Sequence, residues 1–111
     1  MDITEEKRDH VSILELKGRL DANTSSNLEQ KLLGMIANGD KYLVLDLANL
    51  DYISSAGLRV LLIAAKKVGS TDGKLGVAAP KDHVREVFDL SGFTDILDLY
   101  ATRDDAVAGV K

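Results

Sequence analysis

The sequence predicts an α/β protein with a mixed, mostly parallel sheet of about five strands and four helices, in the order β-β-α-β-α-β-α-β-α. Short apolar stretches of strand length alternate with segments in which apolar residues recur at helical spacing. Strands separated by helices of this length are joined by right-handed crossovers, which makes them parallel. The first two strand candidates have no helix between them, so we expect them to form a hairpin.

The opening segment supplies this hairpin and the first helix. A short strand near Ile3 precedes a second, more apolar strand over residues 11–16. Ser26 and Glu29 have the spacing of a capping box, in which each side chain bonds to the other residue's backbone N–H. Apolar residues then recur at helical spacing, which predicts a first helix from Ser26 to Asn38.

The middle of the chain supplies the centre of the sheet. Tyr42–Leu47 is almost continuously apolar, which is typical of a central strand covered on both faces. After a turn through Asn49 and Asp51, the pair Ser54-Ser55 begins a second helix that Gly69 ends. The apolar face of this helix is predicted to consist of Leu58, Leu61, Leu62, Ala65 and Val68.

The last third of the chain completes the alternation. Leu75–Ala79 is predicted as a strand of small residues, and Asp82 as the cap of a short third helix that stops at Gly92. Residues 96–99 are predicted to form the last strand. Thr102 is expected to cap a terminal helix, because two acidic residues follow it in the first turn, where the helix dipole favours negative charge.

Composition excludes several classes of function. The 111 residues are expected to form one domain, residues 1–111, with a net charge of −4 that gives no basic surface for nucleic acid. With no cysteine, and with His10 and His83 far apart in sequence, we expect neither a metal site nor a cofactor. The acidic N-terminus is unlike a signal peptide and no apolar run reaches membrane-spanning length, so we expect a cytoplasmic protein that binds no membrane.

The chemistry is expected at the edge of the sheet where the parallel strands end. The residues after three successive strands should meet there, namely Arg19–Thr24, Leu50–Ser55 and Ala79–Asp82. Ser55 lies at a helix start, where free backbone N–H groups favour an anion. From position alone, Ser54 or Ser55 is better explained as a helix cap without further function.

Four stretches resemble a known family. Residues 45–47 (LDL), 50–58 (LDYISSAGL) and 60–62 (VLL) look like the signature of STAS domains, specifically of bacterial anti-sigma factor antagonists. Residues 16–21 (LKGRLD) are similar to the Gly-x-Leu-Asp turn of the same family. The resemblance runs through the whole chain and implies a phosphoprotein that regulates transcription by partner switching.

The resemblance also implies a partner and a modification. The partner is a serine kinase that acts as an anti-sigma factor, and phosphorylation of the antagonist ends their binding, while a Ser/Thr phosphatase restores it. The family's phosphorylated serine stands two residues before the motif glycine, which points to Ser55, with Ser54 in reserve. Ser54 occupies a position where many members have Asp. The predicted partner surface consists of Asp21, Asn23, Thr24, Asp51, Tyr52, Ile53, Ser54, Gly57, Arg59 and Ile63.

Simple electrostatics gives a mechanism for this switch. A partner can close over a serine hydroxyl, whereas a phosphate brings about −1.5 to −2 charges that must stay hydrated. Asp21 and Asp51 are expected to add repulsion. On a helical wheel, Ile63, with Val60 beside it, falls among cations on the outer face of the second helix, which makes Ile63 a candidate contact. We expect the free chain to be a monomer.

Three other functions compete with this one. A serine hydrolase would need a base near Ser55, for which His83 is the candidate, but the Gly-x-Ser-x-Gly elbow is absent, so we expect no enzyme. A phospho-acceptor site would need Asp21, Asp46 and Asp51 around Mg²⁺, yet Asp46 is better explained as a hydrogen-bonding residue that links a strand end to a helix start. The chain could also be a STAS module of a stressosome-like complex or of an anion transporter. With no Gly-rich phosphate loop, ATP is expected to belong to the kinase.

Overall fold

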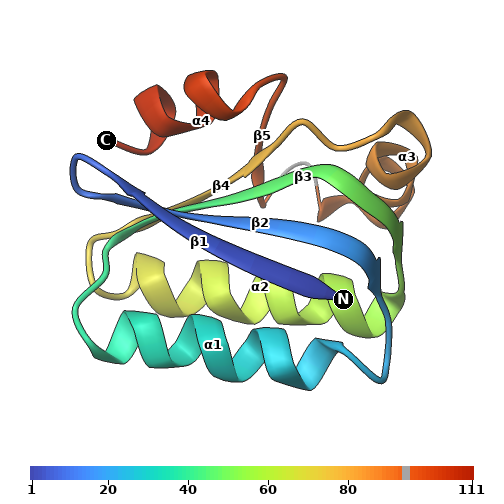
Figure 1. The fold of residues 1–111 in the computed structure, drawn as a ribbon, viewed down its shortest axis with the longest axis horizontal. Coiled ribbons are helices and arrows are strands. Elements are labelled where there is room, and N and C mark those ends of the chain that lie inside the picture. The colour runs from blue at the N-terminus through green and yellow to red at the C-terminus, as the bar shows by residue number, and fades with distance from the viewer. Residues whose placement is uncertain (94–95) are drawn as a thin grey trace.

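The computed structural model describes residues 1–93 and 96–111, and these form the predicted α/β fold (Figure 1). The element order β-β-α-β-α-β-α-β-α is confirmed. The strands are β1 (Asp2–Arg8), β2 (Val11–Leu20), β3 (Tyr42–Ile53), β4 (Lys74–Ala78) and β5 (Asp98–Tyr100). The helices are α1 (Ser25–Ala37), α2 (Ser55–Gly69), α3 (Asp82–Ser91) and α4 (Arg103–Val110).

The strands form one sheet in the order β1-β2-β3-β4-β5. β1 and β2 pair antiparallel as a hairpin, whereas β2, β3, β4 and β5 pair in parallel, as predicted. β3 lies at the centre of the sheet and is the longest strand. Because β2, β3, β4 and β5 are parallel neighbours and each is followed by a helix, their carboxyl ends open onto the same edge.

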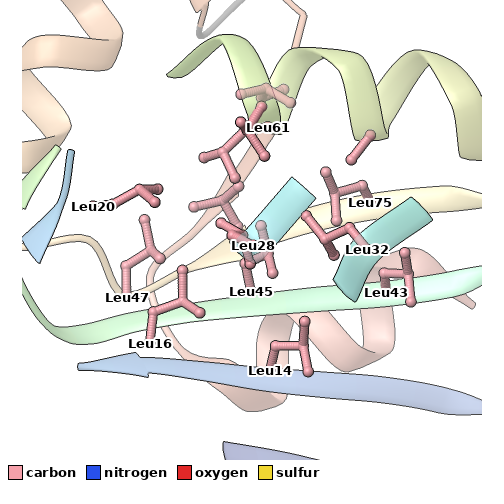
Figure 2. Packing of buried hydrophobic residues seen from close by; sticks show 14 of the residues in the cluster. Leu14, Leu16, Leu20, Leu28, Leu32, Leu43, Leu45, Leu47, Leu61 and Leu75 are labelled. Atoms are coloured by element: carbon pink, nitrogen blue, oxygen red, sulfur yellow. The ribbon is translucent and has the colours of Figure 1, made fainter. Parts of the chain in front are cut away.

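Helices cover both faces of this sheet. α1 and α2 lie side by side below it, and α4 lies above it, while α3 sits at one end (Figure 1). The larger core lies between the sheet and α1 and α2, and is built mainly of leucines (Figure 2). A smaller core beneath α4 contains Val11, Ile13, Val44, Ala78, Ala106, Val107 and Val110. None of the helices in the described ranges is long and apolar enough to cross a membrane.

β3 is apolar on both faces because each face meets a helix. Leu43 and Leu45 are buried in the core beneath α1 and α2, and Val44 is buried beneath α4. Asp46 is also buried, and its Oδ2 accepts a hydrogen bond from Arg103 Nε at 2.7 Å. Arg103 is the first residue of α4, so Asp46 does bond to a helix start, but it does so from within β3 and not from the strand end that was expected.

The predicted capping box is wrong. α1 begins at Ser25, so Ser26 lies inside the first turn, and the cap residue is Thr24. The chain already turns at Asp21, whose carbonyl oxygen accepts hydrogen bonds from the N–H groups of Thr24 (3.2 Å) and Ser25 (2.8 Å). This tight turn starts the helix before the Ser26–Glu29 pattern can cap it.

Other element ends also differ from the prediction. The expected turn through Asn49 and Asp51 is part of β3, because β2 continues to pair with this segment up to Ile53. The cap of α3 is Lys81, and Asp82 is the first helical residue. The last strand starts after Ile96, at Asp98. Thr102 caps α4 as predicted, accepting a hydrogen bond from the Asp105 N–H at 3.0 Å.

Candidate functional site

The three segments that were predicted to meet at the carboxyl edge of the sheet do meet there. Leu20 of β2 pairs with Ile53 of β3, and the N–H of Ser54 donates to the carbonyl of Leu20 at 2.9 Å. From the third segment, Lys81 Nζ donates a hydrogen bond to a carboxylate oxygen of Asp51. The start of α2 therefore lies between the turn after β2 and the turn after β4.

The two serines at the start of α2 have different environments. Ser54 is the cap of the helix, and its Oγ accepts a hydrogen bond from the Gly57 N–H at 3.2 Å. Ser55 is the first helical residue and is exposed, and its hydroxyl has no hydrogen-bond partner among residues 1–93 and 96–111. The cap is thus Ser54, and the hydroxyl that a second protein can reach is that of Ser55.

The first turn of α2 contains backbone N–H groups that have no acceptor in the described part of the chain. The Gly57 N–H is taken by the Ser54 side chain and the Leu58 N–H by the Ser54 carbonyl. The N–H groups of Ser55 and Ala56 bond to no acceptor in the described part of the chain. Unpaired donors at a helix start, together with the helix dipole, stabilise negative charge there.

Gly57 is buried because the chain approaches it closely. A Cβ at this position would lie 2.7 Å from Leu20 Cγ and 3.1 Å from Ile53 Cγ1. Leu20 and Gly57 belong to the two separate sequence motifs, so this contact brings the two motifs together at one site. Ile53 and Gly57 were predicted to contact a partner; both are buried, so they support the site from inside and present no side chain to a partner.

The turn after β2 is stabilised by hydrogen bonds among its own residues. Asp21 Oδ1 accepts hydrogen bonds from the N–H groups of Asn23 (3.0 Å) and Thr24 (3.2 Å). Desolvation works against the ionised form, but these two N–H donors lower the pKa of Asp21 below its usual 3.8. Thr24 Oγ1 donates to the carbonyl of Arg19 at 2.9 Å. Asp21 and Thr24 therefore stabilise the turn, and of the three predicted residues in it only Asn23 is exposed.

Tyr52 and Arg19 form an exposed pair beside the helix start. The Arg19 guanidinium carbon lies 4.1 Å from the centre of the Tyr52 ring, which is the geometry of a cation–π contact. Tyr52 is 39% exposed, so the ring remains available to a partner. The pairing of Arg19 with Tyr52 across β2 and β3 was not predicted, because it depends on the strand register.

Asp51 is not the free negative charge that we expected. The hydrogen bond from Lys81 lowers the pKa of Asp51, and the charge of Lys81 offsets that of the carboxylate. His83 Nε2 donates to the main-chain oxygen of Asp51 at 2.6 Å, so this nitrogen is bonded to β3 and not to Ser55. Lys81 is a site residue that sequence reasoning missed.

The three carboxylates considered for Mg²⁺ do not converge. Asp46 bonds to Arg103 on the α4 side of the sheet, whereas Asp51 bonds to Lys81 at the strand ends. Across residues 1–93 and 96–111, no group of three or more His, Cys, Asp or Glu side chains could hold a metal ion.

The outer face of α2 extends from Ser55. Arg59 is exposed one turn further along, followed by Ile63, which is 37% exposed, and by Lys66 and Lys67. We call the exposed side chains of Arg59, Ile63, Lys66 and Lys67 the outer stripe of α2. The prediction for Val60 is wrong, because it is 4% exposed and packs in the main core together with Ala64.

Comparison with known proteins gives one consistent result. The model of the STAS domain family matches residues 2–106. BtrV, a candidate anti-sigma factor antagonist of Bordetella bronchiseptica, is 41% identical over 111 residues, which cover 100% of this chain and 96% of BtrV. A solved anti-sigma factor antagonist from Mycobacterium paratuberculosis is 31% identical with a TM-score of 0.90, covering 98% of this chain and 92% of its own.

The fold is also that of a protein solved in a phosphorylated state. The Bacillus cell fate determinant SpoIIAA in its phosphorylated form matches with a TM-score of 0.77 at 20% identity, covering 99% of this chain and 100% of its own. At this identity the likeness concerns the fold alone.

Proposed function

Since this chain belongs to the STAS domain family, we propose that it is an anti-sigma factor antagonist whose binding to a serine kinase ends when Ser55 is phosphorylated. The kinase acts as the anti-sigma factor, and binding to the unphosphorylated antagonist makes it release the sigma factor. A Ser/Thr phosphatase reverses the modification. In this proposal residues 1–111 act as one domain and as a monomer when free, and the chain is a regulator and not an enzyme.

The observation that carries the proposal is the different placement of two neighbouring hydroxyls. Ser54 is half-buried and occupied as the helix cap, so a kinase would have to break the cap to reach it. Ser55 is exposed at the first helical position, and it is the serine to which the resemblance in sequence assigns the phosphate. Modification of Ser55 leaves the Ser54 cap in place.

The fold tolerates a phosphate at Ser55. The free N–H groups of Ser55 and Ala56 point out of the helix start, where negative charge is stabilised by about 0.3–1 kcal/mol. A phosphorylated protein of this fold, SpoIIAA, has been solved. We therefore expect phosphorylation to change the surface of the chain and not its architecture.

The same phosphate prevents a partner from covering the site. A kinase surface can close over the neutral Ser55 hydroxyl and the half-exposed Tyr52 ring next to it. A phosphate carries about −1.5 to −2 charges, and burying them without paired cations costs more than an interface of ordinary affinity supplies. Binding is lost with no conformational change in this chain.

The test uses three baits, the wild-type chain and the variants Ser55→Ala and Ser55→Asp. Ser55→Ala should retain the kinase and Ser55→Asp should not, while Ser54→Ala, the matched control, should still be phosphorylated and released. Mass spectrometry of the chain treated with the retained kinase and ATP should place the phosphoryl group on Ser55. A phosphoryl group on another residue, or a phosphorylated chain that still binds, contradicts the proposal. A captured complex without a sigma factor would instead indicate another partner-switching or stressosome-like assembly.

A further inference from the structure

The charged side chains around Ser55 differ in whether they already have a partner. The guanidinium carbon of Arg19 lies 4.1 Å from the centre of the Tyr52 ring, and Arg19 Nε lies 3.8 Å from Asp21 Oδ2. Lys81 is paired with Asp51, and His83 with the main-chain oxygen of the same residue. Asp82, the first residue of α3, is exposed and forms no ion pair within the described ranges, but the basic side chains that face the helix start from β2 and from the start of α3 are all engaged.

Arg59 is the exception. It is exposed on α2 and forms no ion pair with any residue in the ranges 1–93 and 96–111. It follows Ser55 by four residues within the same helix, a spacing that brings side chains together on one face. The order, with the negative group nearer the N-terminus and the cation four residues later, is the more favourable one. α2 itself contains no Asp or Glu that could compete for Arg59.

From this arrangement we infer that Arg59 is the internal counter-ion of the phosphorylated Ser55 side chain. The inference rests on the proposed function, because it concerns the modified form of the same serine. The guanidinium of arginine presents paired N–H donors that match the geometry of two phosphate oxygens. The phosphate would thus be held between the N–H groups of Ser55 and Ala56 on one side and Arg59 on the other.

The pairing has a consequence for the outer stripe of α2. Arg59 stands at the end of the stripe that lies next to Ser55, with Ile63, Lys66 and Lys67 behind it. In the unmodified chain Arg59 is free to meet a carboxylate of a partner. Once Ser55 carries a phosphate, the Arg59 side chain pairs with it. Phosphorylation therefore adds a hydrated anion to the surface, and it also makes Arg59 unavailable to a carboxylate of the partner.

The experiment places phosphoserine at position 55 by genetic encoding, so that no kinase is needed, and follows the phosphate by ³¹P NMR as pH is varied. Replacing Arg59 should raise the second pKa of the phosphate by about 0.3, because a cation favours the dianion. The variants are Arg59→Gln, Arg19→Gln as the rival cation, and Lys67→Gln as the matched control. Lys67 is twelve residues from Ser55, about 18 Å along the helix, and its loss should leave the pKa unchanged.

Two further readouts make the result decisive. The Arg59 Nε–H resonance should shift as the phosphate titrates in the wild-type phosphorylated chain, and the difference between wild type and Arg59→Gln should disappear at 1 M salt. An identical pKa in wild type and Arg59→Gln, or a change only in Arg19→Gln, overturns the inference. Because the phosphate is encoded, that outcome would leave the kinase proposal standing; a failed kinase proposal would likewise leave this measurement intact.

Discussion

Leu20 lies directly against the Cα of Gly57, so closely that a Cβ on Gly57 would come within 2.7 Å of Leu20 Cγ. Leu20 ends β2, and Gly57 is in the first turn of α2. This contact holds the start of α2 against the end of the sheet and fixes where Ser55 stands.

Gly57→Ala should therefore lower the free energy of unfolding by about 1–2 kcal/mol, even though alanine is the better helix former. Gly34→Ala in α1 is the control, because nothing lies within 4 Å of a Cβ at that position. The control should gain about 0.5–1 kcal/mol. Urea unfolding of the three proteins measures both changes, and equal stabilisation by both substitutions would show that the Leu20 contact does not restrict position 57.

Substitution of Ser54 should affect stability, whereas substitution of Ser55 should affect phosphorylation. Ser54→Ala removes the side chain that accepts the Gly57 N–H and should cost about 1 kcal/mol of stability. Ser55→Ala removes an exposed hydroxyl and should change stability by less than about 0.5 kcal/mol. Mass spectrometry after kinase treatment should find the phosphoryl group on Ser54→Ala but not on Ser55→Ala. The opposite pattern would mean that the two roles are exchanged.

Ile63→Asp should weaken binding of the kinase at least about tenfold, because it replaces the one apolar side chain of the outer stripe with a carboxylate. Its thermal stability should stay close to that of the wild type, since Ile63 is already 37% exposed. Leu90→Asp on α3 makes the same chemical change at a residue that is 81% exposed and lies outside the stripe. Calorimetric titration of both variants is the measurement, and equal affinity for Ile63→Asp and wild type would remove α2 from the interface.

The Asp51–Lys81 pair should respond to acid. The hydrogen bond from Lys81 depresses the folded-state pKa of Asp51 below 3.8, so its contribution to stability is present above the unfolded-state pKa and is lost as pH falls through the folded-state value. A carboxyl-detected NMR titration should give a pKa below 3.8 in the wild type and one closer to 3.8 in Lys81→Met. An unchanged pKa in the variant would show that the two side chains do not pair in solution.

Arg103 should stabilise the chain from the other face of the sheet. Its side chain donates to Asp46, whose side chain is 8% exposed, and to Glu15 at 2.8 Å. Arg103→Met leaves the buried Asp46 carboxylate without a cation and should cost about 2–3 kcal/mol. Adding Asp46→Asn should recover part of this loss. Since the network lies across the sheet from α2, kinase treatment should still modify Ser55 in both proteins at a temperature where they are folded.

The fold itself could be predicted from local patterns. The apolar run of Tyr42–Leu47 identified the central strand, because burial on both faces requires apolar residues at successive positions. The Thr102 cap and the Gly92 stop were placed correctly, because helix ends depend on residues that are neighbours in the chain. The start of α1 was misplaced, because it follows a turn in which the Asp21 side chain bonds back to its own loop. The end of β3 was also misplaced, because its extension to Ile53 depends on pairing with β2.

By itself, the sequence determined the strand and helix order and brought two serines to a helix start at the functional edge of the sheet. Only the tertiary structure decided which serine is the cap and which is accessible, and that Lys81 neutralises Asp51. It also decided that Arg19 contacts Tyr52, whereas Arg59 has no ion pair within residues 1–93 and 96–111. The reason is physical: the apolar periodicity that predicts strands and helices is a property of neighbours in the chain. The pairing of charges, in contrast, depends on strand register and on the packing of Leu20 against Gly57, which join residues far apart in sequence.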